Sequence, residues 1–126
     1  MGGALARRLM LSHKLRVLDL KPEAVAEFSE NGAIPAQDGA SLARECDIVM
    51  LCLPRSSDVR AAIFGEGGLL EGLTPGKIVV DQTSGDPDQT RAMAAELAEQ
   101  GITLIDAPVS GGPAGADAGT IAIMAG

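Results

Sequence analysis

The sequence has few aromatic residues and a deficit of positive charge. It contains two Phe, no Trp and no Tyr, and its formal net charge is −7. Nucleic acids and anionic membranes are bound by surfaces rich in Lys and Arg, and single strands also stack on aromatic rings. We therefore expect neither a nucleic-acid partner nor a membrane partner.

Cysteine, histidine and long apolar runs are also scarce. The two cysteines, Cys46 and Cys52, have a spacing that matches no zinc motif, and His13 is the single histidine. We interpret the two cysteines as small buried thiols of a reducing compartment, and we predict no metal site. No apolar stretch could span a bilayer, and the N-terminus lacks the apolar core and cleavage site of a signal peptide. These features favour a cytoplasmic protein.

The chain is nevertheless apolar enough to fold. Hydrophobic residues make up 46% of its 126 residues, which suits one domain with a buried core. Helical and strand patterns alternate, with helices expected over residues 2–12, 22–30, 41–46, 57–64 and 87–100, and a short helix near 114–118. Strands are expected over residues 15–19, 33–36, 47–53, 77–81, 102–105 and 120–124. Such alternation predicts an α/β fold with a Rossmann-like, doubly wound, mostly parallel sheet over residues 1–126.

Local signals support several of these elements. Ser41 is expected to cap the third helix, Ser56 or Ser57 the fourth, and Asp86 followed by Pro87 to begin the fifth. Residues 48–53 are apolar throughout, which is typical of a strand buried on both faces.

Ligands of such sheets bind beyond the carboxyl ends of the strands. The residues in question are Asp19, Leu53–Pro54, Asp81–Ser84 and Asp106–Gly112. In a dinucleotide-binding fold, an acid at the position of Asp19 accepts hydrogen bonds from the adenosine ribose and repels a 2′-phosphate, which favours NAD over NADP. Two alternatives stay open: Asp19 could only cap the next helix, and nearby Lys21 could pair with a 2′-phosphate.

A hydroxyl and two glycines follow the strand that ends at Asp106. Glycines let backbone N–H groups approach an anion, and Ser110 adds a side-chain donor, so Ser110, Gly111 and Gly112 suit a small carboxylate substrate. The alternative is a tight structural turn. Ser110 lacks the G-x-S-x-G context and a nearby His, so it is not expected to be a hydrolase nucleophile.

Taken in order, these motifs resemble the β-hydroxyacid dehydrogenase family, of the 3-hydroxyisobutyrate dehydrogenase and tartronate semialdehyde reductase type. The stretch Asp106–Gly112, D-A-P-V-S-G-G, is the most specific part, and the resemblance covers essentially the whole chain. It implies an oxidoreductase that transfers a hydride between a nicotinamide cofactor and a β-hydroxy acid or its semialdehyde. The implied cofactor is NAD, with NADP as the alternative.

The resemblance also implies roles for ten residues. It places the cofactor against Met1, Gly2, Asp19, Leu53, Pro54, Asp58 and Ser84. It places the carboxylate of the substrate against Ser110, Gly111 and Gly112.

Two parts of the family pattern fall outside the sequence. The first strand, with the start of the glycine fingerprint, would precede Met1, and the catalytic lysine, with an all-helical domain, would follow Gly126. Lys14, Lys21 and Lys77 do not replace that lysine. We therefore expect a truncated NAD-binding domain without turnover. The alternative is a non-catalytic dinucleotide-binding or assembly module, and a homo-oligomer stays open.

The first strand of this fold lies between the second and fourth strands of the sheet. Without it, two strand edges would face each other unpaired, and each buried group left without a partner costs about 1–3 kcal/mol. We expect one of three arrangements: residues before Met1, a strand swapped from a second copy, or direct pairing of residues 15–18 with residues 48–51.

Overall fold

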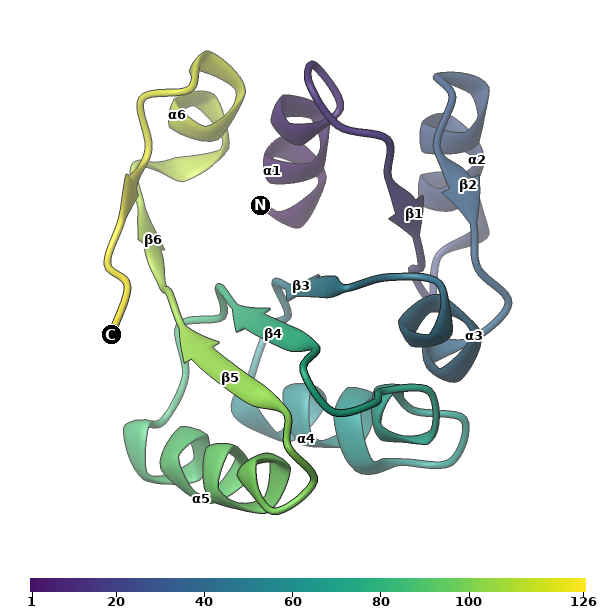
Figure 1. Cartoon of the computed structure of the whole chain (residues 1–126). Helices are drawn as coiled ribbons and strands as arrows, with labels where there is room; N and C mark the ends of the chain where they lie inside the picture. Colours follow the sequence, from purple (N-terminus) through teal and green to yellow (C-terminus); the bar gives the residue numbers. More distant parts are fainter.

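The most apolar strands of the sequence form one three-stranded parallel sheet (Figure 1). In the computed structural model, which describes residues 1–126, β3 (Ile48–Leu51), β4 (Ile78–Asp81) and β5 (Thr103–Asp106) pair in the order β3-β4-β5. The register sets Val49 opposite Val79 and Asp81 opposite Asp106. Because the strands are parallel and in step, their carboxyl ends meet at one edge of the sheet.

Helices cover one face of this sheet. They are α3 (Gly39–Arg44), α4 (Ser56–Phe64) and α5 (Pro87–Ala98), with a short 3-10 helix, η1 (Leu69–Glu71), between α4 and β4. Twelve buried side chains form the core between helices and sheet, and among them Val59, Ile63, Val79 and Leu97 are fully buried. The predicted start of α5 is confirmed, since Asp86 is its N-cap and Pro87 its first residue.

The other face of β3 is bare, so the prediction of a strand buried on both faces is wrong. Ile48 is 56% exposed and Met50 is 40% exposed, whereas Val49 and Leu51 are buried. Successive side chains of a strand point to opposite faces, and α4 and α5 cover only the face of Val49 and Leu51. A hollow of about 230 Å³ lies beside Met50, between α1 (Gly2–Leu9) and α6 (Gly112–Ala118).

A second parallel pair joins β1 (Arg16–Val17) to β2 (Ile34–Pro35), with α2 (Pro22–Glu30) between them in the chain. β1 and β3 belong to different sheets, so the expected direct pairing of residues 15–18 with 48–51 is not adopted. The end of β3 packs instead against α1, where a small cluster of buried residues contacts Cys52. β3 pairs with β4 alone, so its other edge has no partner strand.

The C-terminal segment forms an antiparallel hairpin outside the main sheet. β6 (Val109–Ser110) pairs with β7 (Ala122–Ile123), and α6 forms the connection between them. The last predicted strand therefore exists, but it is shorter than expected. None of the helices is long and apolar enough to cross a membrane.

Two predicted helix caps are wrong. The N-cap of α3 is Asp38, and Ser41 is its third residue, with each side chain bonded to the other residue's backbone N–H. The N-cap of α4 is Arg55, while the Ser56 hydroxyl accepts a hydrogen bond from the Asp86 N–H at 2.8 Å. Ser41 thus completes a capping box with Asp38, whereas Ser56 binds the loop that precedes α5.

The two cysteines are free and half-buried, which corrects the expectation of buried thiols. Burial still raises the pKa of both Cys46 and Cys52, so neither thiol is activated as a nucleophile.

Candidate functional site

The first turn of α1 lies at the carboxyl end of β3. A Cβ on Gly2 would lie 3.4 Å from the carbonyl oxygen of Cys52, in ordinary van der Waals contact, so the helix begins directly beside the residue that follows the strand. The Met1 carbonyl accepts from the N–H groups of Ala4 and Leu5, and the N–H groups of Gly2 and Gly3 have no helical acceptor. No acidic residue occupies this turn. It is therefore suited to an anionic group such as a phosphate.

Asp19 follows β1 on an exposed turn. Its Oδ1 accepts a hydrogen bond from the Lys21 N–H at 2.9 Å, which orients the carboxylate just before α2 begins. Its Oδ2 takes part in no hydrogen bond of the protein. Asp19 therefore orders the turn before α2 but does not cap that helix, because Lys21 is the N-cap and no side chain binds the helix N-terminus.

A buried polar relay connects the carboxyl ends of β3 and β4. The Thr83 N–H donates to Asp81 Oδ1 at 2.9 Å, and the Leu53 N–H donates to the Thr83 hydroxyl at 3.0 Å. Asp81 and Thr83 are each only 3% exposed. Sequence reasoning gave Thr83 no separate role, although a Thr two residues after a strand-end Asp is the signal that could have indicated this turn. The relay fixes the start of the loop at Leu53–Pro54.

Asp58 and Ser84, the other two residues predicted to contact the cofactor on this side, take no part in these hydrogen bonds. Asp58 lies in the first turn of α4 and accepts from the Arg55 guanidinium, Nε to Oδ2, at 3.1 Å. Ser84 is exposed just beyond the relay. Next to it, a Cβ on Gly85 would overlap with the Ser56 hydroxyl, so the loop from β4 packs directly on the beginning of α4.

Ser110 lies in β6, rather than in the loop where it was expected, and is exposed. Gly111 and Gly112 follow with φ angles of 133° and 67°, in the region that favours glycine. The N–H groups of Gly111 and Gly112 donate no hydrogen bond among the turns and loops. Gly112 is the first residue of α6, so its N–H has no acceptor within the helix either. The three residues therefore present one hydroxyl and two free amides to solvent.

Two carboxyl groups face each other where β4 and β5 end. Asp81 and Asp106 are register partners, so their side chains share the same face of the sheet. Burial, and then the charge of Asp81, raise the pKa of Asp106. Both lie among the strand-end residues that the sequence analysis singled out.

Two hollows of the structure lie away from the predicted site residues. A hollow of about 210 Å³ is lined by Arg16, Arg44 and their neighbours beside α3. Neither it nor the hollow beside Met50 contains any of the ten predicted residues. The ten residues therefore lie outside both of these hollows.

The chain is similar to known proteins over its whole length. The family model for the NAD binding domain of 6-phosphogluconate dehydrogenase matches residues 1–126. The 3-sulfolactaldehyde reductase of Escherichia coli (strain K12) is 35% identical over 127 residues, which cover 100% of this chain and 43% of that protein.

Solved structures agree with the sequence comparisons. The Mycobacterium tuberculosis 3-hydroxyisobutyrate dehydrogenase, solved with L-serine, superposes with a TM-score of 0.90 and 28% identity, covering 100% of this chain and 43% of that chain. Psf3 in complex with NADP+ and 2-OPP gives a TM-score of 0.93 and 33% identity, covering 99% of this chain and 45% of its own.

The chain therefore spans less than half the length of these relatives. The match confirms the Rossmann-like fold and the expected resemblance. This chain belongs to the family of NAD-binding domains of 6-phosphogluconate dehydrogenase, as found in 3-hydroxyisobutyrate dehydrogenase-like enzymes.

Proposed function

We propose that this chain binds the dinucleotide along the carboxyl ends of its strands, with NAD preferred over NADP, and that it serves a dehydrogenase of small β-hydroxy acids. The family match over residues 1–126 is the observation that carries the proposal. The nicotinamide would supply the hydride acceptor or donor when bound. The chain's own residues would bind and orient the two ligands.

The cofactor residues fit this task by their chemistry. The free amides of Gly2 and Gly3 suit the pyrophosphate, with Met1 beside them, and the free oxygen of Asp19 suits ribose hydroxyls. The loop at Leu53–Pro54, which the Thr83 relay fixes, would lie along the cofactor, with Asp58 and Ser84 at its margins.

The substrate residues fit a carboxylate. The Ser110 hydroxyl and the amides of Gly111 and Gly112 are donors without protein acceptors, and a carboxylate is acceptor-only when ionised. 3-Hydroxyisobutyrate, for which the Mycobacterium tuberculosis relative is named, carries such a group.

The second candidate function is a non-catalytic binding or assembly module. The position of Lys77 favours this candidate for the 126-residue chain taken alone. The Nζ of Lys77 donates to the carbonyl oxygens of Ala43 and Arg44, at the amino end of β4 and away from Ser110. A general acid or base typically contributes about 10²–10⁴-fold to the rate. We expect the pure 126-residue chain to form no NADH from 3-hydroxyisobutyrate, and measurable turnover would refute this.

Titration with NADH and NADPH tests the cofactor assignment. The wild-type chain should bind NADH more tightly, and Asp19→Ala should narrow the difference by about tenfold, or roughly 1.4 kcal/mol. Asp88→Asn is the matched control, because Asp88 is an exposed acid on α5 that contacts none of the proposed ligand residues. Tighter binding of NADPH by the wild type would overturn the assignment, and Lys21 would then be the residue to substitute.

A further inference from the structure

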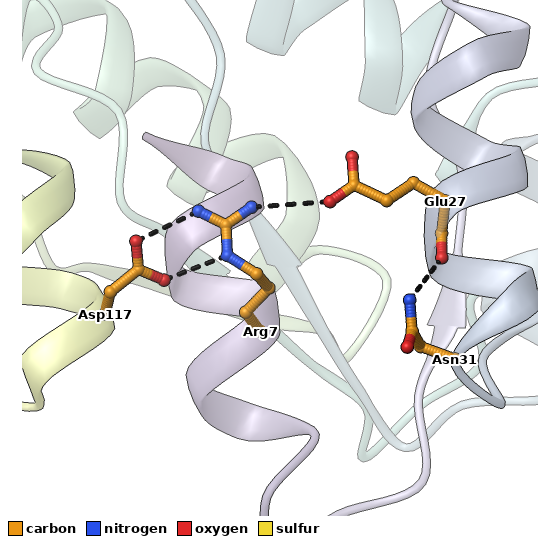
Figure 2. A network of polar contacts seen from close by, with 4 residues as sticks. All are labelled: Arg7, Glu27, Asn31 and Asp117. Carbon is orange, nitrogen blue, oxygen red and sulfur yellow. Dashed lines mark hydrogen bonds and ion pairs between the residues drawn. The ribbon is translucent and has the colours of Figure 1, made fainter.

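One guanidinium connects two helices near the N-terminus with a helix near the C-terminus. Arg7, on α1, donates from Nε and Nη2 to the two carboxylate oxygens of Asp117, on α6, at 2.9 and 3.0 Å. Its Nη1 lies 3.8 Å from Oε1 of Glu27, on α2. Figure 2 shows Arg7 between the two acids, with Asn31 donating to the Glu27 carbonyl beside them. We call Arg7, Asp117 and Glu27 the Arg7 bridge.

Each bridged helix is attached to a different part of the proposed site. α1 begins at Met1 and Gly2, α2 begins three residues after Asp19, and α6 begins at Gly112. We propose that Arg7 is a positioning residue, which holds α6 and therefore the loop of Ser110, Gly111 and Gly112 against the cofactor helix α1. This inference rests on the proposed function, because it concerns the same carboxylate-binding loop.

α6 has little else to hold it. It has seven residues, of sequence GPAGADA, and two of these are glycines, which disfavour a helix. Helices this short are not stable on their own. Its buried contact with α1 consists of Ala116 against Ala4 and Leu5, and the adjoining strands β6 and β7 have two residues each. Val109 and Ile121 pack against the same small cluster, and the Arg7 bridge adds a directional contact to it.

A second arginine reinforces the contact. The Arg8 guanidinium lies against Gly119, which ends α6 with a φ of 75°, and a Cβ there would come within 2.5 Å of it. Adjacent residues of α1 thus contact both the last turn of α6 and its C-terminal end.

The connection from Asp117 to the loop is short. The Gly115 N–H donates to the Gly111 carbonyl at 3.3 Å, so the loop is hydrogen-bonded to the helix that carries Asp117. A bidentate Arg–carboxylate pair fixes orientation as well as distance. The hydrogen bond from Arg7 also lowers the pKa of Asp117, so the acid is ionised at neutral pH.

Exposed ion pairs add little to global stability, and the bridge is exposed. Its effect should therefore be local: loosening the bridge should disorder the Ser110 loop without unfolding the domain. If Arg7 only stabilised the fold as a whole, its substitution would instead speed amide exchange in every helix and strand.

The test compares Asp117→Asn and Arg7→Lys with Arg91→Gln, which breaks an exposed Arg–Asp pair of α5 remote from the site. Lysine keeps the charge of Arg7 but cannot bind two oxygens in fork geometry. Three properties are measured by NMR on the whole chain: amide exchange at Gly111, Gly112 and Gly115 without ligand, NADH affinity, and affinity for 3-hydroxyisobutyrate in saturating NAD+.

We expect both bridge variants to exchange faster at these three glycines and to bind the hydroxy acid about threefold to fivefold more weakly. NADH affinity should stay within about twofold, and Arg91→Gln should match the wild type. At about 1 M salt, which screens exposed charges, the wild type should approach Asp117→Asn.

Two outcomes would overturn the inference: unchanged exchange at the three glycines in both variants, or faster exchange throughout the chain. If the wild type binds no NADH, the proposed function fails, while the ligand-free exchange experiment still decides the role of Arg7.

Discussion

The two halves of the molecule are built in different ways. The sheet half consists of β3, β4 and β5 with α3, α4, α5 and η1, and it packs around twelve buried side chains. The outer half consists of α1, α2, α6 and the strand pairs β1-β2 and β6-β7, and its own cluster has three buried residues. The proposed contacts to pyrophosphate, ribose and carboxylate all lie in the outer half. The proposed loop along the cofactor, at Leu53–Pro54 with Asp58 and Ser84, belongs to the sheet half. The larger core therefore lies in the sheet half, while the proposed anion and ribose contacts lie in the outer half.

The largest effect should come from the core of the sheet half. Ile63 on α4 is fully buried, so Ile63→Ala should lower the free energy of unfolding by about 2–5 kcal/mol, from lost burial and a residual cavity. Leu5→Ala in the outer half should cost clearly less, because Leu5 already borders the hollow beside Met50. Urea unfolding of both variants measures this, and equal losses would remove the distinction between the halves.

A smaller loss of folding free energy is expected at the carboxyl ends of β3 and β4, where Thr83 binds the Leu53 N–H. Thr83→Val keeps the shape of the side chain but leaves the Leu53 N–H without its acceptor, which should cost about 1–3 kcal/mol. Thr74→Val, at an exposed turn, is the matched control and should be near neutral. If thermal unfolding finds the two variants alike, the relay does not hold the Leu53–Pro54 loop.

The sheet half could be predicted well from the sequence, and the physical reason is local. β4 has an uninterrupted apolar run after the turn at Pro75–Gly76, and α5 begins with an Asp–Pro signal. The bare face of β3 could not be predicted, because an apolar run is the same whether or not a helix lies over it. β6 and β7, at two residues each, are too short to have a periodic pattern.

For the candidate site, the sequence could predict only where residues lie relative to the ends of the strands. Asp19 and the Ser110 loop follow strands and lie at the expected edge. The Arg7 bridge could not be predicted, since Arg7 and Asp117 are 110 residues apart and each looks like an ordinary exposed charge. The hydrogen bonds of Thr83 and Ser56 likewise depend on which strands and helices become neighbours.

The smallest effect concerns pH. The raised pKa of Asp106 means that the folded protein holds this proton more readily than the unfolded chain does. Asp106 therefore destabilises the fold as pH rises from its ordinary pKa through the raised value. Asp106→Asn should raise Tm slightly at neutral pH and leave it unchanged at about pH 3, where the carboxyl group is protonated in both states.

Asp88→Asn, which removes an exposed acid with no such burial, is the control for this measurement. A rise in Tm for Asp106→Asn that persists at about pH 3 would show that the gain comes from something other than the carboxylate charge.

Hydrogen exchange along the whole chain, with and without NADH, tests most directly whether a stable sheet half supports a weakly held ligand-binding half. Without ligand, we expect slow exchange in β3, β4, β5, α4 and α5, and faster exchange in α6 and both outer strand pairs. NADH should add protection mainly to the first turn of α1 and to the turn at Asp19. Uniform protection along the free chain, or protection by NADH confined to the sheet half, would contradict the account.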